Sequence, residues 1–416
     1  MRLIVQKYGG TSVGTSGRIR SVACRLVETQ REGYRVVAVI SAMAGVTDEL
    51  IKLAHEMSEH PAERELDILL ATGEHAAAAL VAMAVNAVGG RAISVTGAQA
   101  GILTDRKHTK ARIANISPKQ IHELLSDDYI VIVAGFQGQT PEGETTTLGR
   151  GGSDLTAIAL AGALNADVCQ IFTDVDGVFT CDPRAVLAAK KLDEIAYDEL
   201  LEMASAGSKV VQSRAVEFAK KFGVEFEVRS SFNKRTGTIA KAETTSMEDV
   251  VIRGISLDRH QAKLTIAGVR DEPGIAGRIF SDISAAHIIV DMIVQNASIS
   301  GTTDISFTIH EDELENARKI LMPVVSEVGA TRLNTASGVA KLSVVGIGMR
   351  SHSGVAARLF DCLGKAGINI HLISTSEIKI AIIIDEKDAE RAAQLIHAEF
   401  DLARLMPAAR GTAALA

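Results

Sequence analysis

An internal repeat in the C-terminal part of the chain constrains the fold more than any other feature. One copy, AKLTIAGVRDEPGIAGRIF, begins at Ala262, and the other, AKLSVVGIGMRSHSGVAARLF, begins at Ala340. Each copy reads as a strand, a loop, a helix and a strand, and each continues with a further strand and helix. The pattern predicts two βαββαβ units, each a small sheet with helices on one face.

The N-terminal part alternates short apolar strands with helices. We expect strands at 3–7, 35–41, 91–95, 130–134 and 168–173, and helices at 16–31, 48–58, 65–87 and 154–164. Short apolar runs separated by helices are typical of a largely parallel sheet that helices cover on both faces. Ligands of such sheets bind at the carboxyl ends of the strands.

The domain organisation follows from these two patterns, because 416 residues are too many for one core. A polar, weakly periodic segment at 235–249 marks the boundary. We expect an α/β domain at 1–245, the two repeat units at 246–335 and 336–403, and a disordered tail at 404–416.

Charge and cysteine spacing exclude several classes of protein. The net charge is −7, without a long basic run, so nucleic acid is not expected as a partner. The four cysteines form no C-x-x-C pair, which argues against a zinc site and a disulfide framework and favours a reducing, cytoplasmic compartment. The sequence enters a strand at once, without a signal peptide, and its apolar stretches look too short and too alanine-rich to span a membrane.

The first strand ends in KYGGTS, a lysine followed by two glycines and two hydroxyl residues. Glycines let the backbone approach a phosphate, and the following helix start adds a favourable field. Lys7 would then reach the outer phosphates as a point charge. The alternative is a plain strand-to-helix turn with an exposed lysine. The spacing is not that of a Walker A loop.

A second glycine loop, LGRGGSD, precedes an apolar helix. Ser153 and Asp154 suit the start of that helix whether or not they bind a ligand. Arg150 is harder to explain as scaffold, because a guanidinium among glycines usually contacts a carboxylate or phosphate with two hydrogen bonds. We therefore predict a ligand role for Arg150.

Other polar residues follow strand ends. The segment TDVDG ends a strand with two aspartates, which can hold Mg²⁺ or position a lysine, although a simple turn is an alternative. Ser41 and Thr47 could be caps, and Glu74 suits a helix start with or without a bound amine. No Ser-His-Asp or Cys-His set is evident.

Taken together, KYGGTSV, VISAMAGVTDEL, LLATGE, VAGFQG, TTTLGRGGSDLTA and TDVDGVFTCDPR resemble the aspartokinases, members of the amino acid kinase fold family. The resemblance runs to about Leu402, and the repeats look like ACT domains. It implies that MgATP phosphorylates the side-chain carboxylate of L-aspartate to 4-phospho-L-aspartate, the first step towards lysine, threonine, methionine and isoleucine. Mg²⁺ would be bound mainly through the nucleotide phosphates, without a separate protein metal site.

The resemblance also assigns roles to residues. Lys7, Asp154 and Asp174 are expected to be catalytic, with Asp154 orienting Lys7. Glu74 would bind the ammonium of aspartate and Arg150 its α-carboxylate. The remaining expected substrate residues are Thr47, Gly151, Gly152 and Ser153. The remaining expected nucleotide residues are Tyr8, Gly9, Gly10, Ser41, Thr173, Phe179, Thr180, Asp182, Pro183, Arg184, Lys209 and Val210.

The repeats are expected to bind lysine, threonine or both as effectors. The loop before the first repeat helix presents bare amides suited to an amino acid's carboxylate. The expected effector residues are Asp271, Gly274, Ile275, Ala276, Asp291, Gln295 and Asn296, with Asn369, Ile370, Ser376 and Glu377 from the second copy. The alternative is that the repeats only dimerise. The two loops, RDEPG and MRSHSG, differ, so the two sites need not be alike. Ser298–Gly301 is a short connection, so the identity of the effector stays open.

The resemblance further implies a homo-oligomer through the ACT domains, and it allows a small subunit started near Met247. Two rival functions stay open. One is a kinase of another acid or nucleotide, such as glutamate or N-acetylglutamate. The other is a non-catalytic amino acid sensor, which the retained charged residues disfavour, because a relic would be expected to lose charges that are costly to desolvate.

Overall fold

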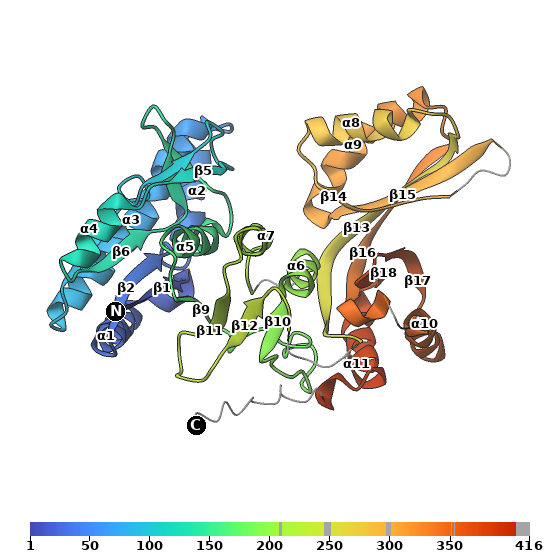
Figure 1. Cartoon of the computed structure of the whole chain (residues 1–416). Coiled ribbons are helices and arrows are strands. Elements are labelled where there is room, and N and C mark those ends of the chain that lie inside the picture. The colour runs from blue at the N-terminus through green and yellow to red at the C-terminus, as the bar shows by residue number, and fades with distance from the viewer. Residues whose placement is uncertain (208–209, 245–250, 297–300, 351, 353, 405–416) are drawn as a thin grey trace.

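The computed structural model of the chain describes residues 1–207, 210–244, 251–296, 301–350, 352 and 354–404 (Figure 1). Lys209, Met247, Ser298 and the tail from 405 onward lie outside the described residues, as does the predicted boundary between 245 and 246. Residue 404, predicted to begin the tail, instead ends a short 3₁₀ helix, Leu402–Arg404.

The N-terminal domain is built on an eight-stranded sheet of order β10-β12-β11-β9-β1-β2-β6-β3. All of its pairings are parallel except β11 with β12. This confirms the predicted parallel sheet, and the five predicted strands lie within two residues of their observed bounds. The strands are β1 (Arg2–Tyr8), β2 (Tyr34–Ile40), β3 (Ala92–Val95), β6 (Ile130–Ala134), β9 (Val168–Thr173), β10 (Glu194–Ala196), β11 (Phe226–Ser230) and β12 (Thr238–Lys241).

Helices cover both faces of this sheet because its buried strands alternate apolar residues to either side. Leu3 and Val5 pack with the helices on one face, and Ile4 and Tyr8 pack with those on the other. The first face carries α4 (Lys119–Ser126), α5 (Gly152–Ala163), α6 (Tyr197–Ser205) and α7 (Ser213–Phe222). The second carries α1 (Ser16–Arg31) and α3 (Glu63–Ala87), and α2 (Val46–Met57) packs on α3.

A smaller four-stranded sheet, of order β5-β4-β7-β8, was not predicted. Its strands are β4 (Ile102–Thr104), β5 (Ile113–Ile116), β7 (Gln137–Gln139) and β8 (Thr145–Thr147). Three or four residues are too few for a period-2 pattern to be recognised in the sequence. This sheet leads into the glycine loop that carries Arg150.

The two repeats share one six-stranded sheet of order β14-β15-β13-β16-β18-β17, with four helices packed against it (Figure 1). The first unit follows the predicted βαββαβ order. The elements are β13 (Gly254–Arg270), α8 (Ile275–Ala285), β14 (Val290–Gln295), β15 (Thr302–His310), α9 (Leu314–Glu327), β16 (Arg332–Val345), α10 (Val355–Lys365), β17 (Ile370–Thr375), β18 (Lys379–Asp385) and α11 (Ala389–Glu399).

The second unit differs from the prediction, because its last strand does not follow its last helix. Residues 254–258 of β13 pair with 341–345 of β16 and supply that strand from the opposite end of the region. Without it, the edge of β16 would be left with unpaired backbone groups. The predicted division between 335 and 336 falls inside the continuous strand β16.

The second unit is the one that contacts the N-terminal domain through α6 (Figure 1). The buried Glu199 of α6 accepts a hydrogen bond from the backbone N–H of Ile347 at 3.2 Å, and Glu202 pairs with Lys379 at 2.8 Å. Burial raises the pKa of Glu199. Glu199 Oε2 also lies 3.4 Å from Nε of the buried Arg253, so the contact places a buried, paired carboxyl group at the junction of the two domains.

Helix α3 is the one helix among the described residues whose length and composition would allow it to cross a membrane. From the sequence, the apolar stretches are expected to be too short to span a membrane. That expectation was wrong on length, because α3 has 25 residues. A core helix passes the same test, and half of the most apolar window of α3 is buried against the rest of the domain.

Candidate active site

The carboxyl ends of four neighbouring strands meet at one edge of the large sheet. Lys7 in β1 pairs in register with Val39 of β2 and Ile171 of β9, and Val39 pairs with Val133 of β6. Each strand ends one or two residues later, so the loops that follow them lie side by side. Most of the residues that the sequence singled out lie in these loops or in the helices that start from them.

Lys7 lies at the end of β1 and forms an ion pair with Asp154 in the first turn of α5. Lys7 Nζ is 2.6 Å from Asp154 Oδ1, and the two side chains are 12% and 10% exposed. An ammonium so enclosed has little water left around it, yet only one carboxylate faces it among the described residues. The pair agrees with the predicted orientation of Lys7 by Asp154 and leaves donors of Lys7 for an anion.

The two glycines after Lys7 make a close backbone approach possible. The Gly9 N–H donates to the carbonyl of Phe172 at 3.2 Å, which ties the loop to the end of β9. A Cβ on Gly10 would lie 2.7 Å from the carbonyl oxygen of Ala42, so no larger residue fits there. The loop is thus held between the ends of β2 and β9, beside Lys7.

Arg150 projects from a left-handed turn at the start of α5. Gly149 and Gly151 on either side have φ of 79° and 71°, and a Cβ on Gly151 would lie 2.3 Å from Cβ of Gln212. These positions require glycine. Arg150 is exposed and has no ion-pair partner among the described residues. Because Asp154 lies one helical turn further on, Arg150 and Lys7 lie at the same end of α5.

The loop before Arg150 is held by residues that sequence reasoning missed. Arg214 of α7 donates to the carbonyls of Leu148 and Ala111 at 2.5 and 3.0 Å. Asp67 of α3 is fully buried and accepts hydrogen bonds from His108, the Thr109 N–H and Thr147 Oγ1. The sequence did offer a signal for Asp67, because an aspartate within an apolar helical run is expected to be buried. A buried carboxylate needs several hydrogen-bond donors around it.

Glu74 lies on the same inward face of α3 as Asp67, two turns along. Its Oε1 accepts a hydrogen bond from the Ala42 N–H at 3.2 Å, while its buried Oε2 has no partner among the described residues. Burial raises the pKa of Glu74 to about 7. Ser41 precedes Ala42, Thr47 lies in the first turn of α2, and both are partly buried. Glu74 thus offers an unsatisfied carboxylate oxygen behind the loop that follows β2.

The predicted nucleotide segment begins at the end of β9, where Thr173 Oγ1 donates to Asp174 at 3.1 Å. Ser231, which the sequence did not indicate, donates to the carbonyl of Thr173 and accepts from Ser12 at 2.9 Å, which links this segment to the glycine loop. Further along, the predicted residues Phe179, Pro183 and Val210 are partly buried, and the exposed Asp182 pairs with Arg184 at 2.8 Å.

Thr180 does not present its side chain to a ligand. It is fully buried, its hydroxyl lies 2.9 Å from His397 Nε2 of the second repeat, and its carbonyl accepts from the Ile255 N–H. The side chain of Thr180 therefore joins the two domains, and its contact with the nucleotide stays a prediction.

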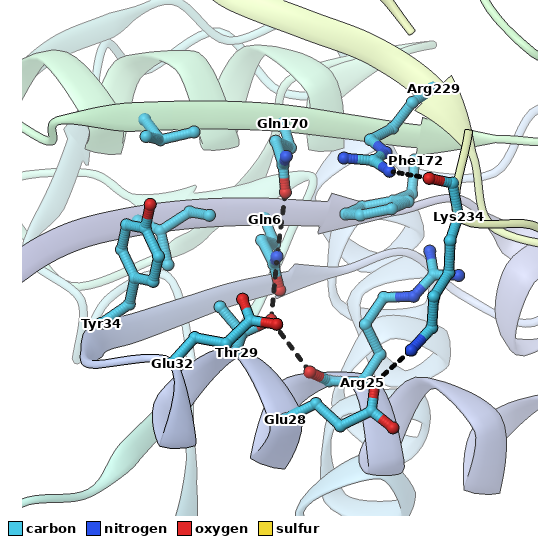
Figure 2. Close-up of a pocket in the computed structure, with 12 residues that line it drawn as sticks. Gln6, Arg25, Glu28, Thr29, Glu32, Tyr34, Gln170, Phe172, Arg229 and Lys234 are labelled. Atoms are coloured by element: carbon cyan, nitrogen blue, oxygen red, sulfur yellow. Dashed lines mark hydrogen bonds and ion pairs between the residues drawn. The ribbon is translucent and has the colours of Figure 1, made fainter. Parts of the chain in front are cut away.

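The side chain of Tyr8 also points away from Lys7, because successive residues of a strand face opposite sides of the sheet. The Tyr8 hydroxyl donates to Gln6, which bonds to Gln170 on β9. Gln6 and Gln170 line a cavity of about 280 Å³ between β1, β9, β11 and α1 (Figure 2). This cavity lies on the face opposite Lys7 and Asp154, so only the backbone of Tyr8 lies at the candidate site.

The predicted effector residues lie in the repeat sheet. Gly274, with φ of 95°, caps α8, and the Asp271 N–H donates to the carbonyl of Gly301. The exposed Asp291, Gln295 and Asn296 lie on or just after the edge strand β14, which packs against β17 of the second unit. The other predicted members are Ile275 and Ala276 in the first turn of α8, and Asn369, Ile370, Ser376 and Glu377 on or beside β17.

Comparison with known proteins identifies the family. Residues 2–230 match the amino acid kinase family, and residues 264–322 and 342–400 match the ACT domain. The chain is 52% identical to an aspartate kinase of Stutzerimonas stutzeri, over 97% of this chain and 98% of the relative. It is 46% identical to the aspartokinase of Corynebacterium glutamicum, over 97% of each chain. The chain belongs to the aspartokinases of the amino acid kinase family.

Solved aspartokinase structures share this fold. That of E. coli aspartokinase III with aspartate and ADP has a TM-score of 0.80 at 25% identity, covering 95% of this chain and 99% of that one. The same enzyme with lysine and aspartate has a TM-score of 0.77 at 26% identity, covering 96% and 99%. The amino acid kinase fold with C-terminal ACT domains is thereby confirmed for this aspartokinase.

Proposed function

We propose that this aspartokinase transfers the γ-phosphoryl group of ATP to the side-chain carboxylate of L-aspartate, giving 4-phospho-L-aspartate and ADP. The observation that carries the proposal is the pairing of Lys7 with Asp154 at the same helix start that carries Arg150. We assign one cation, Lys7, to the phosphate donor and the other, Arg150, to the acidic acceptor. Near-full-length relatives that are named aspartate kinases support the choice of acceptor.

The proposed mechanism needs no protein nucleophile, because the substrate carboxylate attacks the γ-phosphorus directly and the bond to the β,γ-bridging oxygen breaks. Glu74 and Arg150 hold the ammonium and α-carboxylate and so aim the other carboxylate. Lys7 stabilises the negative charge that develops on the phosphoryl oxygens. Catalysis is then alignment together with charge stabilisation.

Mg²⁺ is proposed to bind mainly through the nucleotide phosphates, where it neutralises part of their charge. Asp174 is an exposed carboxylate at the end of β9, beside the Ser231 link to the glycine loop. Asp174 is therefore the residue proposed to contact a hydrated Mg²⁺ on one side. No group of three or more metal-ligating side chains lies together in the part of the chain that the structure describes.

An ATP-dependent hydroxamate assay with aspartate and with glutamate tests the proposal. Hydroxylamine traps an acyl phosphate, so we expect product with aspartate and little with glutamate. Product with glutamate alone would favour the rival kinase. Amino acid binding without turnover on either acid would favour the sensor.

The raised pKa of Glu74 predicts a pH-dependent affinity for aspartate. An ammonium binds the ionised carboxylate, so KM for aspartate should rise by up to about tenfold per pH unit below pH 7. Glu74→Gln should raise KM and flatten this profile, while Glu49→Gln, on the exposed side of α2, should keep it. The same slope in Glu74→Gln would contradict the assignment.

The same pKa gives a stability effect of defined sign. Glu74 has a higher pKa in the folded protein, about 7, than its ordinary 4.5, so the native state binds more protons between these values. Its contribution to stability is full below pH 4.5 and is lost as the pH rises to 7. The difference in free energy of unfolding between Glu74→Gln and the wild type should therefore shift in favour of the variant as the pH rises from 4.5 to 8.

We further propose feedback inhibition by lysine, threonine or both, bound at the ACT units through β14, β17 and the loop before α8. Gln295 is exposed at the end of β14, in a different sheet from Lys7, so Gln295→Ala should weaken inhibition and leave turnover intact. Inhibition curves for each amino acid check this. An unchanged half-inhibitory concentration would count against the effector site.

The division into domains at 245 and 335 also stays a proposal. So do assembly into a homo-oligomer through the ACT units, a small subunit started near Met247, and a cytoplasmic location.

A further inference from the structure

Lys341 is a buried cation in the regulatory sheet. It lies on β16 and is 4% exposed. The residues next to it on the same face are Val339 and Ser343, which are also buried, and Ile383 lies opposite on β18. A lysine almost never occupies such a position without a charged partner, because an unpaired buried ammonium is costly.

Its partner comes from the other repeat. Lys341 Nζ forms an ion pair with Asp291 Oδ2 on β14. The pairing of β14 with β15 shifts register between Val290 and Ile293, around the position of Asp291. The side chain of Asp291 is 35% exposed, whereas that of Lys341 is 5% exposed. A solute can therefore reach the carboxylate, but not the ammonium.

The corresponding positions of the two repeats do not form a second pair of this kind. Lys263 of the first unit corresponds to Lys341 at an offset of 78, and His371 of the second corresponds to Asp291 at an offset of 80. His371 bonds instead to Asp385, and Lys263 has no ion pair among the described residues. One repeat thus supplies the carboxylate and the other the cation, and the reverse combination is missing from the described part.

Polar atoms near Lys341 lack partners of their own. Ser343 Oγ is buried and takes part in no hydrogen bond, and the buried Gln261 Oε1 accepts none, within the described part of the chain. Asp258 lies directly opposite Lys341 on β13 and accepts a hydrogen bond from Gln261. An ammonium that left Asp291 would therefore find other acceptors within the same sheet face.

These acceptors adjoin the N-terminal domain. Asp258 packs against Gly207, where an added Cβ would lie 3.0 Å from Cβ of Asp258. Ser256, opposite Ser343, donates to the carbonyl of Met203 in α6 at 3.2 Å. Gly207 follows the end of α6. A shift of Lys341 towards Asp258 would thus act on the contact of the repeat sheet with α6 and Gly207.

We propose that Lys341 is an internal competitor for the ammonium group of the amino acid effector at Asp291. This inference rests on the proposed feedback inhibition. The effector displaces Lys341 from Asp291, and the displaced ammonium is accommodated by Asp258, Gln261 and Ser343. Lys341 thereby sets both the affinity for the effector and the transmission of binding to α6.

Lys341→Met tests both consequences, because methionine fills the space without a charge. Without the competitor, the Kd for L-lysine or L-threonine, measured by titration calorimetry, should fall about tenfold. Maximal inhibition should fall as well, because no buried ammonium is displaced. Asp291→Asn should weaken binding about tenfold or more. Lys341→Arg, which keeps the pair, and Lys263→Met, at the matched position, should behave as the wild type.

Two results would overturn the inference. One is Lys341→Met with unchanged Kd and full inhibition. The other is Asp291→Asn with unchanged Kd, which decides the matter even if Lys341→Met does not fold. The proposed feedback function fails separately, if the unmodified enzyme binds neither amino acid and neither lowers its turnover.

Discussion

Lys7→Ala is expected to lower the turnover number by about 10²–10³-fold while the protein remains folded, since removing one aimed charge from a phosphoryl-transfer site has effects of that order. The ammonium lies 2.6 Å from Asp154 and beside Gly9, where an added Cβ would lie 3.4 Å from Lys7 Nζ. Alanine removes the charge where the donor phosphates are proposed to lie. KM should change less than turnover, because the charge on the phosphoryl oxygens grows in the transition state.

Stability will also fall, because Lys7→Ala leaves the carboxylate of Asp154 without its cation. The pair retains some contact with water, so the loss should be smaller than the roughly 3–5 kcal/mol of a fully buried pair. A matched control lies on the same sheet. Lys241 pairs with Glu194 at 2.6 Å between β12 and β10, and the two side chains are 20% and 12% exposed.

Lys241→Ala should therefore cost comparable stability and leave turnover near normal. Thermal melting and steady-state kinetics on the two variants separate lost chemistry from lost structure. Equal turnover losses in both would show that Lys7 acts only through the fold. Near-normal turnover in Lys7→Ala would remove its phosphate role.

The sequence predicted the large sheet because its signal is strong. Few folds other than a parallel sheet fit apolar runs of four to seven residues that are separated by long helices. It could not predict the swapped strand at 254–258, because that strand looks like an extension of the first repeat. Its place in the second unit is decided by its pairing with β16, a contact between segments that are far apart in the sequence.

The candidate site shows a similar limit. Motifs located Lys7 and Arg150, since charged residues beside glycines at the ends of strands or the starts of helices are unusual. The expectation that Glu74 lies at a helix start was wrong, because Glu74 lies in the middle of α3. The motifs do not record which face of a strand Tyr8 occupies, or that the second repeat covers the side chain of Thr180. Asp67 and Arg214 were missed because they act through backbone carbonyls, amides and hydroxyls that have no sequence pattern.

Arg150→Ala is expected to raise KM for aspartate about 100-fold, with KM for ATP nearly unchanged. Two charge-assisted hydrogen bonds to a carboxylate contribute about 3 kcal/mol in a partly solvated site, which corresponds to that factor. The proposed contact is with the α-carboxylate, away from the reacting group, so turnover at saturation should fall less than kcat/KM. Arg150→Lys should recover little, because an ammonium lacks the planar fork.

A substrate change isolates this contact. β-Alanine keeps the amine and the reacting carboxylate of aspartate but lacks the α-carboxylate. The wild type should prefer aspartate to β-alanine by about the same 100-fold in kcat/KM. Arg150→Ala should reduce this ratio towards one, because the arginine and the α-carboxylate are the two partners of a single interaction. Arg106→Ala, which removes an exposed arginine paired with Glu142, controls for general electrostatics and should keep the preference. If Arg150→Ala still prefers aspartate as strongly, another group binds the α-carboxylate and the two cations do not divide donor and acceptor between them.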